Sequence, residues 1–123
     1  MQKSIREHLS ENRDVQACLA LAGMALLFFA EALSSPASVL YSSFSDIINQ
    51  RMAWQEHLRR GLILHGELPL WYPNIFAGIP FIGNPECWAF YPINWLLLPL
   101  PANISILWMI VLHLVLGGVG CFG

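Results

Sequence analysis

Two long apolar runs, separated by a mixed central stretch, dominate the pattern of side chains along the chain. The first begins at Val15 and meets no charged residue before Glu31. The second extends from Ile104 to Phe122, and its only ionisable side chain besides a cysteine is His113. A membrane-spanning helix needs about 20 mostly apolar residues. The pattern therefore predicts two transmembrane helices joined by a long loop.

The first apolar run also has features of a secretory signal peptide. Basic residues precede it, and Ala30 and Ala32 have the spacing of the small residues at a cleavage site. The apolar core is, however, long for a signal peptide, and apolar chain continues beyond the pair of alanines. We therefore expect this run to remain as an uncleaved span.

The start of the central stretch is typical of an amphipathic helix. Ser43 and Ser45 are candidate N-caps, because their side-chain oxygens can accept from the first free N–H groups of a helix. Helical spacing then separates a less polar face from a charged one. The less polar face holds Ile48, Met52, Gln55, Leu58 and Leu62, and the charged face holds Asn49, Arg51, Glu56, Arg59 and Arg60.

The stretch from Glu67 to Pro101 is rich in proline and aromatic residues. It holds seven of the eight prolines, all except Pro36, and no Lys or Arg follows Arg60. Prolines at this density exclude long regular helices and central strands. Because Trp and Tyr favour the membrane–water interface, the stretch is predicted to be an irregular loop on the bilayer surface.

The positions of the basic residues predict a topology. Three Lys and Arg precede the first span, three lie in the much longer loop and none follows the second span. Under the positive-inside rule this favours a cytoplasmic N-terminus. The expected architecture is an all-α membrane protein with a cytoplasmic segment (1–14), a first transmembrane helix and its outer end (15–40), an extracytoplasmic loop (41–101) and a second, apparently truncated transmembrane helix (102–123).

Composition agrees with a membrane protein and excludes several other classes. Apolar residues make up 56% of the chain and charged residues 11%, against about 25% charged residues in soluble domains. A net charge of -2 gives no basic surface for nucleic acid. The three cysteines are scattered without ligand spacing, so no disulfide framework, metal site or cofactor is expected.

Three ionisable residues are candidates for a functional role. Asp46 follows the first span, where a carboxylate could serve as a general base or hold a metal ion beside a phosphate, although the first turn of a helix would also stabilise it. Glu31 is either an interfacial residue or the buried partner of an Arg or His. His113 is expected to be a neutral histidine that hydrogen-bonds to another helix of a bundle.

Several strings in the second half of the chain resemble a known family. The strings are GELPLWYP (66–73), FAGIPF (76–81), NPE (84–86), FYPIN (90–94), LHL (112–114) and GGVG (117–120). The first four resemble, in order and spacing, the first large extracytoplasmic loop of the bacterial YfhO-like membrane proteins, whose pattern is G-E-x-P-L-W-N-P, G-x-P-F, N-P-Q and F-Y-P-x-N. The last two are similar to a later span of that family, in which L-H-L is followed by G-x-G. The resemblance covers about Ser43 to Phe122 and departs at Tyr72, usually Asn, and at Glu86, usually Gln.

The resemblance implies an integral-membrane glycosyltransferase of the GT-C-like type in a bacterial plasma membrane. Such enzymes transfer a sugar from a polyprenyl-phosphate carrier to an envelope acceptor, and a carboxylate in the place of Asp46 commonly acts as the base. The prolines and aromatics would shape a cleft for the acceptor or the lipid carrier. The residues expected to bind substrate are Trp71, Pro73, Asn84, Glu86 and Tyr91.

Enzymes of this type build the donor cavity from many more spans than two. The chain is therefore expected to be an N-terminal portion, inactive alone and completed by downstream helices or another membrane subunit. The alternative is a non-enzymatic two-span membrane protein whose aromatic loop binds a lipid or a protein partner.

Overall fold

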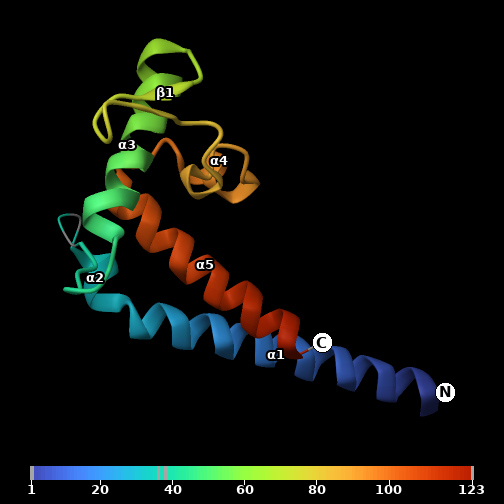
Figure 1. The fold of residues 1–123 in the computed structure, drawn as a ribbon. Helices are drawn as coiled ribbons and strands as arrows, with labels where there is room; N and C mark the ends of the chain where they lie inside the picture. The colour runs from blue at the N-terminus through green and yellow to red at the C-terminus, as the bar shows by residue number, and fades with distance from the viewer. Residues whose placement is uncertain (1, 36, 38, 123) are drawn as a thin grey trace.

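The computed structural model describes residues 2–35, 37 and 39–122 and is mostly helical (Figure 1). Pro36, Ser38 and Gly123, which belong to the two predicted spans, lie outside the described residues, as does Met1. In chain order the elements are α1 (Gln2–Phe28), α2 (Ala30–Ser34), the π-helical η1 (Ile47–Met52), α3 (Ala53–Arg59), the π-helical η2 (Arg60–His65), β1 (Trp71–Tyr72), β2 (Ile79–Pro80), the 3-10 helix η3 (Pro85–Cys87), α4 (Pro92–Leu97) and α5 (Ala102–Phe122).

Helix α5 fits the second predicted span. Its segment Ala102–Cys121 has 20 residues and a mean hydropathy of 2.2, and it measures about 30 Å at 1.5 Å per residue. This length matches the hydrocarbon core of a bilayer. Among the described residues it is the one helix that is long and apolar enough to cross a membrane.

The first predicted span is divided between two helices. The apolar part of α1 begins at Val15 and ends at Phe28, so it measures only about 21 Å. Helix α2 follows after the single residue Phe29, whose N–H donates to Ala25 O (3.1 Å) and whose carbonyl accepts from Leu33 N–H (2.8 Å). The residues of α1 before Val15 are mostly polar, so the apolar part of α1 by itself does not reach the length of a span.

The predicted amphipathic helix is confirmed as the rod η1–α3–η2. Trp54, Gln55 and Leu58 are buried along one side, and the rod ends at Gly66, whose φ of 68° is left-handed and suits glycine. At the start of the rod, Oγ of Ser45 accepts a hydrogen bond from Ile47 N–H (3.3 Å). The pattern correctly places the buried face at Gln55 and Leu58 but does not include Trp54. Ile48, which the pattern places on the same face, is 40% exposed because it lies at the free N-terminal end of the rod.

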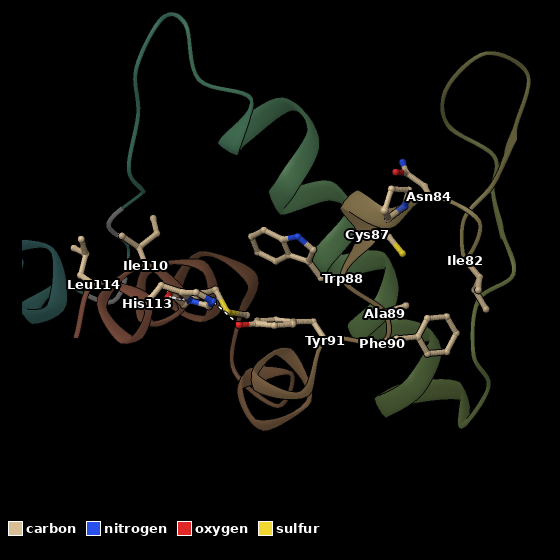
Figure 2. A pocket seen from close by; sticks show the side chains of 12 residues that line it. Ile82, Asn84, Cys87, Trp88, Ala89, Phe90, Tyr91, Ile110, His113 and Leu114 are labelled. Atoms are coloured by element: carbon tan, nitrogen blue, oxygen red, sulfur yellow. Dashed lines mark hydrogen bonds between the residues drawn. The ribbon is translucent and has the colours of Figure 1, made fainter. Parts of the chain in front are cut away.

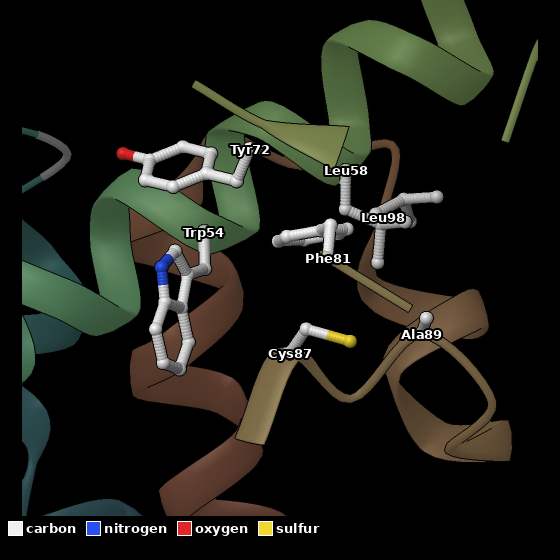
Figure 3. Close-up of a cluster of buried hydrophobic side chains, with 7 residues drawn as sticks. All are labelled: Trp54, Leu58, Tyr72, Phe81, Cys87, Ala89 and Leu98. Carbon is white, nitrogen blue, oxygen red and sulfur yellow. The ribbon is translucent and has the colours of Figure 1, made fainter. Parts of the chain in front are cut away.

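The proline-rich stretch packs onto this rod around a small core of its own (Figure 3). The strands β1 and β2 pair antiparallel, with Trp71 opposite Pro80 and Tyr72 opposite Ile79. This stretch is therefore irregular, as predicted, but it forms a packed subdomain. The core side chains are Trp54, Leu58, Tyr72, Phe81, Cys87, Ala89 and Leu98.

The turn between β1 and β2 requires a glycine at one position. Phe76, Ala77 and Gly78 all have positive φ, and that of Gly78 is 108°. A Cβ at Gly78 would lie 2.3 Å from Nε1 of Trp71. The indole of Trp71 therefore lies directly over the glycine, and this contact fixes the hairpin.

Helix α5 runs back along α1, so that its C-terminal end lies beside the middle of α1 (Figure 1). At the contact, a Cβ on Gly118 would lie 3.4 Å from Cδ1 of Leu21. The subdomain built on η1–α3–η2 stands at the other end of this pair of helices.

Candidate functional site

A groove of about 820 Å³ lies between the proline-rich stretch and α5 (Figure 2). Its walls are mostly apolar, and Asn84, Tyr91 and His113 add polar groups. One wall comes from residues 82–91 and the other from the middle of α5, so the groove forms only when the two segments pack together. The lining residues are Ile82, Asn84, Pro85, Cys87, Trp88, Ala89, Phe90, Tyr91, Met109, Ile110, His113 and Leu114.

A hydrogen-bonded pair, Tyr91 and His113, joins the two walls of the groove. Nδ1 of His113 donates to the carbonyl of Met109 (2.6 Å), because a carbonyl oxygen can only accept. In a neutral ring Nε2 is then the acceptor, and it faces the hydroxyl of Tyr91 (Figure 2). The expected partner of His113 on another helix is thus replaced by Tyr91 and by the backbone of α5 itself.

Asn84 and Glu86 organise the start of η3 at the edge of the groove. Oδ1 of Asn84 accepts from the N–H of Glu86 (3.0 Å) and caps the short helix. The Glu86 carboxylate accepts from Nε2 of Gln50 (2.8 Å), and its backbone carbonyl accepts from the guanidinium of Arg51. Glu86 thus ties the groove to η1.

Arg51 also lies over the ring of Trp88, with its guanidinium carbon 4.0 Å from the ring centroid. Trp88 lines the groove, so this cation lies at the groove's edge. A cation over an indole ring is stabilised by about 0.5–1 kcal/mol at an exposed site. Among the described contacts, Arg51 donates only to a carbonyl and has no carboxylate partner.

The other two arginines of the rod share the single carboxylate of Glu56. Its carboxylate lies 2.8 Å from Nε of Arg59 and 2.8 Å from Nε of Arg60. The hydrogen bond from Arg59, followed by that from Arg60, lowers the pKa of Glu56 from 4.5 to about 2 against an opposing effect of burial. The same hydrogen bond raises the pKa of Arg59. Among the described residues of the rod, Arg51 is therefore the arginine without a carboxylate partner.

A buried polar network lies behind the groove. Nε2 of Gln55 donates to Oδ1 of Asn94 (2.8 Å) and to Oγ of Ser105 (2.9 Å), and Nδ2 of Asn94 donates to the carbonyl of Trp88 (3.1 Å). This network joins α3, α4 and α5. In the sequence, the only indication of this network is that Gln55 lies on the apolar face of the predicted helix.

The predicted substrate-binding residues fall into two groups in the structure. Asn84 and Tyr91 line the groove, and Glu86 lies next to it. Trp71 and Pro73 instead belong to the exposed hairpin, where the Trp71 carbonyl accepts from Nε2 of His57 (3.0 Å). They are not among the residues that line the groove.

The predicted catalytic residue Asp46 lies at the exposed N-terminal end of η1. Its side chain makes no capping hydrogen bond, whereas its carbonyl accepts from Gln50 N–H (2.9 Å) and Arg51 N–H (3.1 Å). Asp46 does not line the groove. Within the described residues no cluster of three metal-ligating side chains occurs.

Glu31 lies in the first turn of α2, with an exposed side chain. It borders a second hollow of about 350 Å³, whose other lining residues are apolar and come from α1, α2, α5 and the segments that follow α1 and α2. Of its two predicted roles, this position fits an interfacial residue.

No protein-family model, no curated protein and no solved structure matches this chain. The interpretation of the groove therefore depends on its own geometry.

Proposed function

We propose that the chain is part of a YfhO-like membrane protein of the glycosyltransferase type and that its groove holds the lipid carrier. In this proposal a sugar is transferred from a polyprenyl phosphate to an envelope acceptor at a bacterial plasma membrane. Further helices or another membrane subunit complete the enzyme, and the chain is inactive alone.

The observation that carries the proposal is the apolar groove with Arg51 at its edge, the arginine of the described rod that has no carboxylate partner. Isoprenoid chains offer only apolar surface, which suits walls made by Phe90, Ile110 and Leu114. Arg51 has guanidinium N–H groups beyond the one that it donates to Glu86, and guanidinium groups bind phosphate oxygens well. An apolar tail and an anionic head therefore match the two parts of the site.

Two spans and a cytoplasmic N-terminus are part of the proposal. Support for a first span comes from the backbone hydrogen bonds that bridge α1 and α2, since Val15 to Ser34 together measure about 30 Å. Several large apolar side chains of α1 are also exposed, among them Leu19, Leu27 and Phe28. Such a surface requires lipid or additional helices to cover it.

A second candidate function, lipid or partner binding without catalysis, is favoured by a different observation. None of the described residues that line the groove is acidic, and Asp46 lies outside it. To separate the two candidates, Asp46→Asn can be introduced with the remaining helices or subunit present. The transferase proposal expects sugar transfer to be lost while carrier binding persists, and unchanged transfer would remove Asp46 from the reaction.

Binding of the carrier itself can be measured with a photoreactive polyprenyl phosphate in lipid nanodiscs. We expect cross-links within residues 82–91 or 109–114, and farnesyl phosphate should compete about tenfold better than farnesol, the equivalent of one charge-assisted contact. Arg51→Gln should remove this preference. Arg60→Gln is the matched control, because Arg60 is already paired with Glu56. Cross-links confined to other segments, or equal competition by the alcohol, would contradict the proposal.

A further inference from the structure

The short helix α4 and the residues just before it lie beside α5 rather than beyond its end. Tyr91 contacts His113, which lies eleven residues after Ala102, the first residue of α5. At 1.5 Å per residue this point is about 16 Å along the helix axis. If α5 crosses a hydrocarbon core of about 30 Å, Tyr91 reaches its middle.

From the depth of this contact we infer that residues 88–97 form a re-entrant element, inserted beside α5 into the leaflet that contains the N-terminal end of α5. The partner of its outer surface is the acyl chains of that leaflet. The inference rests on α5 crossing a membrane, as proposed above, but it does not depend on sugar transfer.

The outer surface of this element is apolar and uncovered. Phe90 is 70% exposed, Trp95 49% and Leu96 75%. Residues 87–123 contain no Asp, Glu, Lys or Arg at all. In water such a surface is costly, since burial of apolar area contributes about 25 cal/mol per Å², whereas in lipid the same side chains are in a favourable solvent.

Several backbone groups of the element are satisfied within it, as irregular structure in a membrane must be. The N–H groups of Tyr91, Asn94 and Trp95 donate to carbonyls of the same segment. Nε1 of Trp95 donates to the carbonyl of Ala89 (2.8 Å), and Asn94 binds the carbonyl of Trp88. Among the described residues no buried side-chain nitrogen or oxygen lacks a partner.

The tip of the β1–β2 hairpin also has an exposed aromatic side chain, and it serves as the comparison for Phe90. Phe76 is 91% exposed, but it belongs to the hairpin that packs on α3 at the end of the molecule away from α1 and α5 (Figure 1). An aromatic side chain of similar exposure is therefore expected in water at position 76 and in lipid at position 90.

The test is cysteine labelling of the protein reconstituted in phosphatidylcholine nanodiscs. Cys18, Cys87 and Cys121 are replaced by alanine, and single cysteines are introduced as Phe90→Cys, Leu96→Cys, Phe76→Cys and Leu116→Cys. A water-soluble maleimide should react with positions 90 and 96 at least about tenfold more slowly than with position 76. Position 116, on the part of α5 distant from the subdomain, should be as slow as positions 90 and 96. After denaturation in dodecyl sulfate, all four should react equally.

Two other labelling results would contradict the inference. Fast labelling at 90 and 96 with slow labelling at 116 would overturn the inference and leave α5 as a span. Fast labelling at all four positions would overturn the span itself and with it the proposed function.

A second measurement needs neither the introduced cysteines nor the replacement of Cys87 in the core. Lipids brominated on the acyl chain quench nearby tryptophans, so Trp95→Phe should reduce the quenched fraction of the fluorescence. Trp71→Phe should leave the quenched intensity unchanged, and equal effects of the two substitutions would overturn the inference.

Discussion

At the scale of single residues, Glu56 pairs with two of the three arginines of the rod. Its carboxylate binds both Arg59 and Arg60, and these contacts lower its pKa to about 2. A carboxylate with a lowered pKa stabilises the folded state above its ordinary pKa, and this contribution is lost as the pH falls towards the folded pKa.

Glu56→Gln should therefore destabilise the protein in a pH-dependent way. We expect a loss of about 1 kcal/mol at pH 7, a modest value because Arg60 is 64% exposed and solvent screens such pairs. The difference from the unsubstituted protein should shrink below pH 4.5 and vanish near pH 2. Thermal unfolding in mild detergent, followed by tryptophan fluorescence, measures it. Glu67→Gln is the control, and a difference independent of pH would contradict the expectation.

Some of these residue-scale features could be predicted from the sequence, and others could not. Ser45 was identified as a cap because capping depends on residues two or three apart. The Gln55 network could not be predicted, because its partners Asn94 and Ser105 lie 39 and 50 residues away. Nothing local to Gln55 distinguishes a buried amide from one that faces water.

At the scale of elements, the β1–β2 hairpin depends on a single glycine. Gly78 combines a φ of 108° with an indole ring directly above it. Any side chain would have to adopt a disfavoured backbone conformation, at a cost of about 1–3 kcal/mol, and would also displace Trp71.

Gly78→Ala should therefore unfold or loosen the hairpin while leaving the long helices intact. We expect a destabilisation of at least about 2 kcal/mol and faster quenching of tryptophan fluorescence by acrylamide as Trp71 is displaced. Gly83→Ala is the matched control, since the nearest atom to a Cβ there is 3.7 Å away. Equal stability of the two variants would show that the contact with Trp71 does not fix the turn.

The elements differ in how well the hydrophobic pattern predicts them. The rod from Ile47 to His65 and helix α5 follow from helical periodicity and apolar length. The strands β1 and β2 have two residues each, too few for any alternation to be recognised. Their pairing depends on the tertiary contacts of Tyr72 and Phe81 with the rod.

At the scale of the whole molecule, the proposed topology has the N-terminal end of α1 and the C-terminal end of α5 on the same side of the membrane. The C-terminal end of α5 lies beside α1 (Figure 1), as a hairpin of two antiparallel spans requires. The packing of the proline-rich stretch onto α3 was not predicted, because it joins segments distant in sequence.

Labelling of single cysteines in intact bacteria tests this topology. In a background without the native cysteines, Glu67→Cys should react with an impermeant maleimide in intact cells. Asp14→Cys should react only after permeabilisation, because the N-terminal segment is proposed to be cytoplasmic. Reaction of Asp14→Cys in intact cells would contradict the orientation, and a shortened product that lacks this residue would instead indicate a cleaved signal peptide.

The hydrogen bonds from Gln55 to Ser105 and from Tyr91 to His113 also have a consequence for biosynthesis. Chains are made from the N-terminus, so the rod and the aromatic segment leave the ribosome before α5 exists. The polar groups of Gln55 and Tyr91 therefore have no hydrogen-bond partners in α5 until α5 has been translated. Contacts of long sequence separation also form slowly. If α5 crosses a membrane as proposed, folding of the subdomain can therefore be completed only after α5 has been made and lies beside it.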